Sequence, residues 1–518
     1  MNKYYLLTIT LLYSVLSFSQ DGTLDSSFGL IYQFPGFYFK TITSYGEYNN
    51  GKANALALSS TGSIRIGATE EKRSTYSSPL VNSFGFHTVS ANGTISNDNI
   101  SGSGYLENCS NTIFLSNGKS LLIGSKYYDN NFVNNGDILM QFNNADGTID
   151  TSVYPVTGQK TINIAFREDI TSIKEYDNKL YACGNIIITE NQTPKILVAR
   201  FDLNGNLDTT FNTTGYKTLD LNGLNVCSDL SVQSDGKILL VAHSTTDPNN
   251  FIVYRLNNDS TLDTTFGTNG IKYVNLGANG NSIPNTIIIQ SDHKILVSGT
   301  LNLNNSNVFN YAVARLNENG SLDTSFGSNG FYKTMVGISP SGSCTDMKLL
   351  SNGKIILAGN LKTGTGIGLL KLNSNGTLDN TFGTNGITTT VNNNITNVSV
   401  SKIAIKSDGK VLVVGGAKAN APNNQTQIFI AQYNNSNTLG NEKFKKDKST
   451  IYPNPVKEAI YLSNITKAEY EIFNILGESI SKGISNENQI NVNSLTKGIY
   501  ILRFKDEDVI FNQKFIKE

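Results

Sequence analysis

The stretch LDTSFGSNG, Leu322–Gly330, decides the fold because the chain repeats it. Its copies are LDTTFGTNG at Leu262–Gly270, LDNTFGTNG at Leu378–Gly386 and weaker forms at Leu207–Gly215, Ile149-Asp150 and Leu24–Gly29. Self-similarity at a regular spacing is the signature of an array in which each unit buries its apolar face against the next. The chain is therefore expected to be a repeat protein.

A second repeated element, a tight turn followed by an apolar strand, has the same spacing. Clear copies are SDGKILLVA from Ser234, SNGKIILAG from Ser351 and SDGKVLVVG from Ser407. Glycine accepts positive φ and Asp or Asn caps its own turn, so Asp/Asn-Gly-Lys predicts a hairpin. The lysine position recurs about every 57 residues, at Ser63, Lys119, Lys179, Lys237, Lys294, Lys354 and Lys410.

Each period contains four short runs suited to strands, for example Thr345–Leu350, Lys354–Gly359, Ile367–Leu372 and Ile387–Val391. Four strands in a period of this length are typical of a propeller blade, because solenoid coils are usually shorter. The sequence predicts an all-β fold, with a seven-bladed β-propeller over residues 20–440.

The two ends of the array complement each other. The seventh repeat has three strands and a decayed element at Leu439-Gly440, whereas Leu24-Asp25 precedes the first repeat. We expect the segment between Leu30 and Thr43 to supply the outer strand of the last blade, which removes an exposed sheet edge.

The aspartates of the LD element are expected to cap turns through backbone N–H groups, while the following Phe packs between blades. These aspartates are Asp25, Asp150, Asp208, Asp263, Asp323 and Asp379. Calcium binding is the alternative, but one carboxylate per copy is short of the six to eight oxygens that Ca²⁺ takes. Turn capping is favoured, and no metal or cofactor is predicted.

The first nineteen residues have the pattern of a signal peptide. Lys3 precedes the apolar run Tyr4–Leu16, and Ser17-Phe18-Ser19 predicts cleavage between Ser19 and Gln20. A membrane anchor is the alternative, but the apolar run is too short to span a bilayer comfortably. The sequence therefore predicts export, with no transmembrane segment after the signal is removed.

Four cysteines in an exported chain invite a disulfide interpretation. Cys109, Cys227 and Cys344 occupy equivalent positions in alternate repeats, which places them too far apart to pair. Together with Cys183 they are expected to be small buried residues.

A different domain follows the repeats. The charged residues 441–449 form a linker, and residues 450–518 alternate as strands of a small β-sandwich. Hairpins are expected at Asn474–Gly477 and Thr496–Gly498.

Charge and chemistry give little support to catalysis or nucleic-acid binding. The 41 Lys and Arg balance the 41 Asp and Glu, so no overall field attracts nucleic acid. His87, His243 and His293 lie in separate repeats, and Glu70-Glu71 and Glu168-Asp169 are interpreted as solvated. Gly364–Gly368 is not a phosphate loop, because no helix follows it. We expect no enzyme activity.

Tyrosines of the early loops are the candidate ligand contacts. They are Tyr45, Tyr48, Tyr76, Tyr105, Tyr127 and Tyr128. Exposed rings can stack on sugars, but packing between blades is the commoner use of Tyr and is favoured.

The repeats resemble the delta-60 repeat family, in which DGK and an apolar strand precede R-L/F-N-x-x-G and the LD element. Ala314-Arg315-Leu316-Asn317 and Ala199-Arg200-Phe201-Asp202 supply the middle piece, and Ile95-Ser96 departs from the LD pattern. The resemblance implies a propeller of undefined biochemical role.

Residues 450–518 resemble the sorting domain of type IX secretion substrates from Bacteroidetes. The matching residues are Tyr452, Pro453, Asn454 and Pro455, the run Ile472–Gly477, Leu495, Gly498, Tyr500 and the ending Lys517-Glu518. The resemblance implies a partner, the type IX machinery, and removal of the domain with the cargo released or attached to lipopolysaccharide. An ordinary accessory sandwich is the alternative.

Together these patterns predict an exported, cell-surface or secreted propeller that acts as a binding scaffold for an extracellular glycan or protein ligand. A secreted polysaccharide- or ester-cleaving enzyme and a purely structural surface component are the alternatives.

Overall fold

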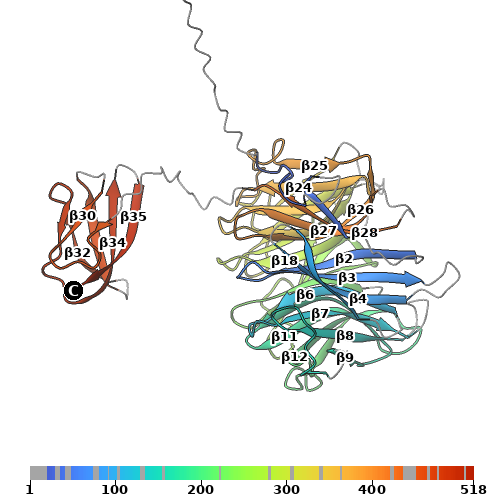
Figure 1. The fold of residues 1–518 in the computed structure, drawn as a ribbon. Helices are drawn as coiled ribbons and strands as arrows, with labels where there is room; N and C mark the ends of the chain where they lie inside the picture. The colour runs from blue at the N-terminus through green and yellow to red at the C-terminus, as the bar shows by residue number, and fades with distance from the viewer. Residues whose placement is uncertain are drawn as a thin grey trace, which may run out of the picture. The chain divides into compact units, whose positions relative to one another are not determined.

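The computed structural model describes residues 20–518 except for gaps at 30–34, 41–47, 74–80, 91–92, 102–105, 129–134, 155–157, 221–222, 224, 278–281, 304–308, 338–341, 362–363, 420–424, 436–450, 464–466, 475–477 and 507–508. The chain divides into two compact units, Met1–Asn437 and Thr438–Glu518, which are described one at a time (Figure 1). The expected signal peptide, the linker 441–449 and Gly477 lie outside the described residues.

The first unit consists of antiparallel four-stranded sets that follow the chain order. The first three sets are β2 (Tyr48–Leu58), β3 (Ile64–Arg73), β4 (Val81–Val89) and β5 (Ile95–Ser101); β6 (Leu106–Phe114), β7 (Ser120–Tyr127), β8 (Gly136–Asn143) and β9 (Gln159–Ile162); and β10 (Arg167–Tyr176), β11 (Lys179–Ile187), β12 (Lys195–Asp202) and β13 (Tyr216–Leu219). A single parallel pairing, Arg167 with Gly136, joins the last two of these sets into one sheet.

Three further sets complete the regular repeats. They are β14 (Asn225–Val232), β15 (Ile238–Ser244), β16 (Asp247–Leu256) and β17 (Ile271–Asn275); β18 (Ser282–Ile289), β19 (Ile295–Asn302), β20 (Phe309–Leu316) and β21 (Phe331–Thr334); and β22 (Ser343–Leu349), β23 (Ile355–Asn360), β24 (Gly366–Leu372) and β25 (Ile387–Val391). The strands expected between Thr345 and Val391 correspond to β22–β25, with ends that differ by one or two residues.

The last sheet combines the two ends of the unit. β26 (Ile395–Ile405), β27 (Val411–Ala419) and β28 (Gln427–Tyr433) pair in order, and β1 (Phe37–Lys40) forms the edge next to β28. The register pairs Phe37 with Ala431 and Lys40 with Ile428. Leu24 makes a further bridge to Tyr433, so the N-terminal segment supplies the fourth strand that the seventh repeat lacks.

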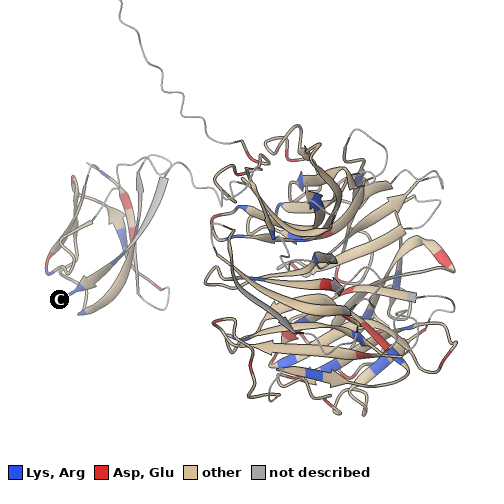
Figure 2. Ribbon diagram, turned by 45° about the vertical axis from the view of Figure 1, so that its right-hand side comes forward, with Lys and Arg blue, Asp and Glu red and all other residues tan. Residues whose placement is uncertain are grey.

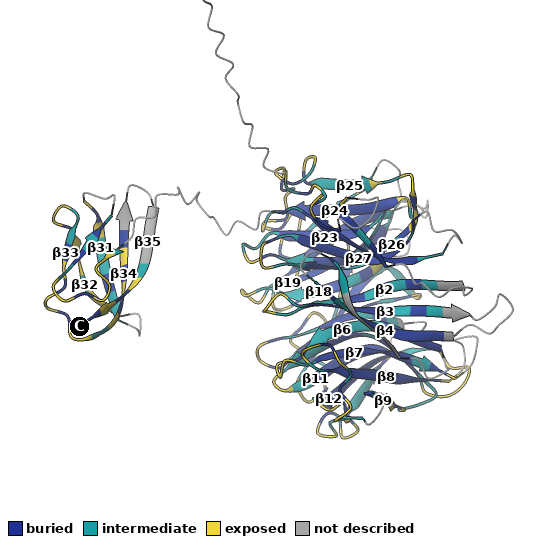
Figure 3. Cartoon of the chain, viewed as in Figure 1, coloured by how far each residue is buried: buried dark blue, intermediate teal, exposed yellow. Residues whose placement is uncertain are grey.

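Apolar side chains are packed between neighbouring sheets. The middle strands of each sheet are buried on both faces (Figure 3), as expected when sheets stack on sheets. One cluster joins Leu239 and Val241 of β15 to Ile295 and Val297 of β19. Another joins the last sheet to the first, through Leu412 and Val414 of β27 and Ile64 and Ile66 of β3.

The Phe of the LD element lies in the apolar clusters between neighbouring sheets, where we call it a plug. The rings at Phe28, Phe211, Phe266, Phe326 and Phe382 are at most 1% exposed. Gly320 has φ +84°, and a Cβ there would meet the Phe266 ring at 2.9 Å. The glycine of one repeat therefore makes room for the aromatic ring of the repeat before it.

The first strand of each set carries a β-bulge at an equivalent position. The residue without a partner in the register is always polar: Asn54, Ser110, Thr171, Ser228, Asn285, Thr345 and Ser401. A bulge sharpens the local twist and re-aims side chains. We call the end of the sheets that carries the first tight turns, such as Gln233–Lys237, the turn end, and the opposite end the loop end.

The second unit contains two sheets around one core. β29 (Ile451–Tyr452), β30 (Ala459–Leu462) and β33 (Gln489–Asn491) form one sheet, and β32 (Ser479–Ile484), β31 (Glu469–Asn474), β34 (Gly498–Asp506) and β35 (Val509–Lys517) form the other. Ile460, Leu462, Ile472, Leu502 and Phe515 are buried between them.

The prediction of a hairpin at Thr496–Gly498 is wrong. This segment leaves β33 in one sheet and enters β34 in the other, and the Tyr500 hydroxyl donates to the Thr496 carbonyl oxygen at 2.9 Å. The Thr-Lys-Gly pattern predicts a change of direction but does not determine which sheet the next strand joins.

The motif residues at the start of the second unit are exposed, from Tyr452 to Pro455. Asn454 nevertheless holds the last strand, because its amide donates to the Lys514 carbonyl at 3.0 Å and accepts from the Ile516 N–H at 2.9 Å. The matching residues thus tie the beginning of this unit to its end.

Candidate functional site

At the turn end, each LD aspartate is the centre of a buried polar network. In the repeat of Asp263, Oδ1 accepts from the Thr265 N–H at 3.0 Å and the Thr265 hydroxyl at 2.7 Å. Oδ2 accepts from Lys237 Nζ at 3.0 Å and from Arg255 Nε at 2.8 Å. The aspartate caps its own turn and also binds the first turn and the third strand of the same sheet.

The same network recurs around the unit. The lysine–aspartate pairs are Lys119–Asp150, Lys179–Asp208, Lys237–Asp263, Lys294–Asp323, Lys354–Asp379 and Lys410–Asp25. The third-strand partners are Arg200, Arg255, Arg315, Lys371 and, for Asp25, the amide of Gln432. The sequence did not predict these partners, although the lysine and the arginine recur with the aspartate at fixed spacing.

These contacts lower the pKa of the aspartates. Burial alone raises the pKa of Asp379, but bonds from Thr381 and Lys354 and the charge of Lys371 outweigh it and lower the pKa to about 2. In Asp263 and Asp323 the same balance lowers the pKa further. Each carboxylate therefore stays charged and bonded at neutral pH, and its role is to hold the fold.

The third-strand arginines also connect neighbouring sheets. Arg315 lies over the Phe326 ring with its Cζ 4.6 Å from the centroid, and it donates to the Ser374 carbonyl of the next repeat at 2.7 Å. Further bonds from Nε to Asp323 and from Nη2 to Ser325 keep this charge bonded within the protein. At the turn end, this arginine therefore holds neighbouring repeats together.

The loop end has a different character in the first two sheets. There a hollow of about 650 Å³ is lined mostly by polar residues from β2, β3, β4 and β6 and by Thr426, which immediately precedes β28. We call it the amide pocket, with the lining residues Asn50, Gly51, Lys52, Asn54, Thr69, Glu71, Asn82, Asn108, Cys109, Ser110 and Thr426. Its volume lies in the range of ligand sites, about 300–1,000 Å³.

The floor of the amide pocket is a chain of hydrogen bonds. The Asn54 amide donates to the Thr69 hydroxyl at 2.8 Å, which donates to Asn108 Oδ1 at 2.9 Å. At the rim, the Asn50 amide donates to Glu71 Oε2 at 3.0 Å. Asn54 and Ser110 are bulge residues, so the irregularity of the first strands helps to position this surface.

Two groups in the amide pocket lack partners. Asn82 is 4% exposed, and its Oδ1 accepts no hydrogen bond from the residues that the structure describes. Lys52 makes no ion pair within the described part of the chain, and burial lowers its pKa. A buried acceptor that receives no hydrogen bond costs free energy unless a bound molecule donates one. This pocket is therefore the candidate binding site.

Two hollows at the turn end have their charges paired internally. One contains Lys348 and Lys406, which bind Asp346 at 2.7 Å and Gln432 at 3.0 Å. In the other, Glu175 accepts from the Ser116 N–H at 2.7 Å. Neither therefore has the unsatisfied groups of the amide pocket.

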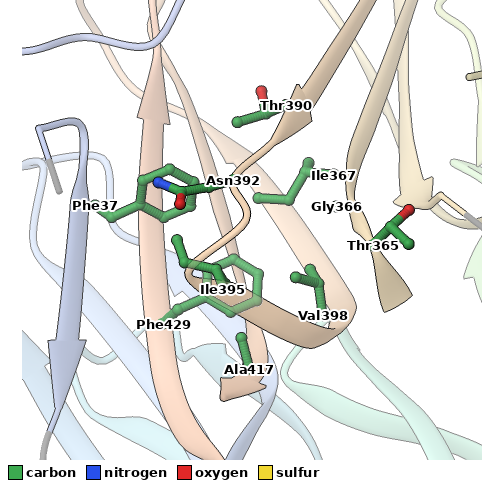
Figure 4. A pocket seen from close by; sticks show the side chains of 10 residues that line it. All are labelled: Phe37, Thr365, Gly366, Ile367, Thr390, Asn392, Ile395, Val398, Ala417 and Phe429. Carbon is green, nitrogen blue, oxygen red and sulfur yellow. The ribbon is translucent and has the colours of Figure 1, made fainter. Parts of the chain in front are cut away.

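A crevice between β24–β25 and the last sheet is too small for a ligand. Figure 4 shows Phe37, Ile367, Ile395 and Phe429 among the side chains around it, and its volume of about 10 Å³ approaches that of one water. Thr365 and Gly366 of the rejected phosphate-loop motif line this crevice, and they lead into strand β24.

The three histidines lie apart, as expected. His293 occupies the glycine position of its turn with φ +63°, and His243 lies in β15. His87 is buried, and its Nε2 contacts Glu70 Oε1 at 2.8 Å. Lys40 of β1 contacts the same oxygen at 2.7 Å, so this cluster links the N-terminal strand to the first sheet.

The prediction that Glu70-Glu71 and Glu168-Asp169 are solvated is wrong for one residue of each pair. Glu70 and Glu168 are fully buried. Burial, with Asp137 nearby, raises the pKa of Glu168 to about 8 although the Ala165 N–H donates to it at 2.5 Å. Both pairs lie on strands, where alternate residues face opposite sides, so one carboxylate of each pair turns inward.

The tyrosine candidates divide in the same way. Tyr127 is 5% exposed, so it is not a surface ring, whereas Tyr128 is 40% exposed and donates to Asp137 at 2.6 Å. Tyr45, Tyr76, Tyr105 and the side chain of Tyr48 lie outside the described residues. No tyrosine lines the amide pocket.

Charges of both signs are interspersed over the first unit (Figure 2). Within the described residues, no three His, Cys, Asp or Glu side chains lie in an arrangement that could hold a metal ion. Nor does this part of the chain contain a helix with the length and apolar character to cross a bilayer. All four cysteines are free and buried.

The comparisons with known proteins fit this architecture. Residues 450–518 match the secretion system C-terminal sorting domain. Five segments, 177–211, 233–266, 290–326, 350–382 and 406–439, match the domain of unknown function (DUF5122) beta-propeller. The chain is therefore an all-β protein of propeller-type repeats with a type IX sorting domain, which directs its export to the cell surface or the medium.

Two solved structures are distantly similar to the chain. PorZ, a surface component of the type IX secretion system of Porphyromonas gingivalis, is 9% identical with a TM-score of 0.26, covering 90% of this chain and 81% of its own. A Dyadobacter fermentans protein of unknown function is 12% identical with a TM-score of 0.37, covering 77% and 99%. At these scores neither carries an argument. A search of the curated proteins finds no match.

Proposed function

We propose that the first unit is a closed seven-bladed propeller that acts as an extracellular binding module, with the amide pocket as its ligand site. Apolar clusters between each sheet and the next, including the last and the first, support the ring. The pairing of β1 with β28 supports its closure by the N-terminal strand. Export by the sorting domain places such a module outside the cell.

The unsatisfied Asn82 Oδ1 carries the binding proposal. The two hollows at the turn end pair their charges internally, whereas this pocket keeps a buried acceptor and the desolvated ammonium of Lys52 in one hollow. Such groups persist in ligand sites because the bound ligand supplies their partners. That the chain lacks catalytic residues and a cofactor stays a prediction.

The proposal is tested by binding to extracellular polysaccharides and surface proteins with the purified exported chain and its Lys52→Met variant. Methionine keeps the length of the side chain and removes the charge. We expect saturable binding by the native chain and at least about tenfold weaker binding by the variant, the value of one lost charge-assisted bond. Equal binding by both proteins, or binding by neither, would contradict the proposal.

A further inference from the structure

We propose that the ligand of the amide pocket is an uncharged, hydroxyl-rich carbohydrate. This inference rests on the proposed function and names the ligand class of the same site. It follows from the charges, from the free donor and acceptor groups, and from the kinds of side chain that line the pocket.

The pocket contains one cation and one anion that do not neutralise each other. Lys52 and Glu71 both line it, but they make no ion pair with each other. Among the described residues, the Glu71 carboxylate accepts a hydrogen bond from the neutral Asn50 amide and from no cation. An anionic ligand that approached Lys52 would meet the charge of Glu71, and a cationic ligand would meet Lys52. The two charges together favour a ligand without net charge.

The remaining groups are balanced between donors and acceptors. The hydrogen-bond chain uses the amide nitrogen of Asn54 and the carbonyl oxygen of Asn108. It leaves Asn54 Oδ1 and Asn108 Nδ2 without a bond to any residue that the structure describes. Asn82 Oδ1 adds a second acceptor, and the Lys52 ammonium adds a donor. The pocket therefore needs a ligand that donates and accepts at neighbouring atoms.

A sugar hydroxyl meets this requirement, because each hydroxyl donates one hydrogen bond and accepts others. A carboxylate or sulfate only accepts and would leave Asn54 Oδ1 and Asn82 Oδ1 unfilled. An ammonium only donates and would leave Lys52 and Asn108 Nδ2 unfilled. The arrangement thus matches adjacent hydroxyls on one ring, and it penalises either kind of charged substituent.

The pocket recognises its ligand by hydrogen bonds and not by stacking, because its lining includes no aromatic ring. Since no net charge is transferred between ligand and pocket, salt has little to screen. Binding should therefore be almost independent of ionic strength, in contrast to the recognition of an acidic polysaccharide by surface lysines.

The test is a glycan array with neutral, acidic and amino-sugar oligosaccharides, at low and at high salt, with the purified exported chain. Two variants accompany it. Asn82→Leu removes the buried acceptor. Asn310→Leu is the matched control, since Asn310 is also a buried asparagine near the start of a third strand but does not line the pocket.

We expect neutral glycans to bind equally at both salt concentrations, and Asn82→Leu to weaken this binding by about tenfold. The melting temperature of Asn82→Leu should equal or exceed that of the native chain, since no bond is lost. Asn310→Leu should bind like the native chain. Selective binding of acidic or amino sugars that Asn82→Leu abolishes would overturn the inference and keep the proposed site. Glycan binding that Asn82→Leu leaves unchanged, or no glycan binding at all, would overturn the inference. The proposed site falls as well only if surface proteins also fail to bind the native chain in preference to its Lys52→Met variant.

Discussion

The two ends of the same sheets differ in how their polar groups are satisfied. At the turn end, a lysine, an aspartate and usually an arginine meet in one repeat after another, and Asp323 alone binds Lys294, Arg315 and its own turn. At the loop end of the first two sheets, Asn82 Oδ1 accepts no hydrogen bond and Lys52 makes no ion pair among the residues that the structure describes. We therefore assign the repeated network to the stability of the fold and the amide pocket to ligand binding.

The largest expected effect comes from removing residues 20–40. This deletion takes away β1, the Phe28 plug and Asp25, which accepts from Lys410 Nζ at 2.6 Å and Gln432 at 2.6 Å. Losing one buried Phe already costs about 3–5 kcal/mol, so we expect the first unit to lose its cooperative unfolding transition. Calorimetry tests this, and an unchanged melting temperature would refute closure by the N-terminal strand.

Acid is expected to weaken the turn end as a whole. The folded state lowers the pKa of each LD aspartate, to about 2 in Asp379 and further in Asp208, Asp263 and Asp323. A depressed folded pKa contributes stability above the unfolded pKa, about 3.9, and that stability is lost as the pH falls. The free energy of unfolding should decline steadily from about pH 5 to pH 2. A flat profile in denaturant titrations would contradict the network.

A single member of the network should have a large effect. Asp323→Ala leaves Lys294 and Arg315 without their shared anion, and we expect a loss of about 3 kcal/mol. The control is Asp292→Ala, which removes an exposed carboxylate 4.0 Å from the same lysine and should change stability by less than about 0.5 kcal/mol. Similar losses in both variants by urea denaturation would show that the buried position of Asp323 does not matter.

A carboxylate at the loop end should have the opposite pH dependence. Glu168 is fully buried and its folded pKa is raised to about 8. A raised folded pKa favours the protonated native state, so its contribution falls as the pH rises from the unfolded pKa of about 4.3 to about 8. Glu168→Gln should raise stability at pH 8 by about 1–2 kcal/mol and leave it unchanged at pH 4. Destabilisation at pH 8 would indicate a bound cationic partner.

The smallest effect concerns the cysteines. Burial raises the pKa of the Cys109 thiol to about 12, and all four thiols are free and buried. The native chain should therefore resist thiol reagents at neutral pH, and the unfolded chain should react at four sites. Rapid labelling of the native chain would show that a sheet opens, and fewer than four reactive thiols after unfolding would reveal a disulfide.

Much of the turn end could be predicted from the sequence, because its features recur at a fixed spacing. The LD aspartates and the plugs such as Phe266 and Phe326 occupy the expected positions. Lys294 and Arg315 were recognised as repeated but not as partners of Asp323, since spacing along the chain does not say which side chains meet. Three residue types that recur together are the signal that identifies such a network.

The amide pocket could not be predicted in this way. Asn50, Asn82 and Asn108 come from three different strands, so only the folded chain brings them together. Glu70 and Glu71 illustrate the same limit. Their adjacent charges were interpreted as solvated, yet the strand turns Glu70 into a buried cluster with His87 and Glu71 into the pocket.

The most direct test compares Asn82→Leu with Asp323→Ala in two assays, thermal unfolding and binding of the best neutral glycan below the transition. We predict that Asn82→Leu keeps its melting temperature and loses binding, whereas Asp323→Ala melts earlier and binds like the native chain while it is folded. If Asn82→Leu binds normally, or if both variants lose stability and binding together, the division between a structural turn end and a binding loop end is contradicted.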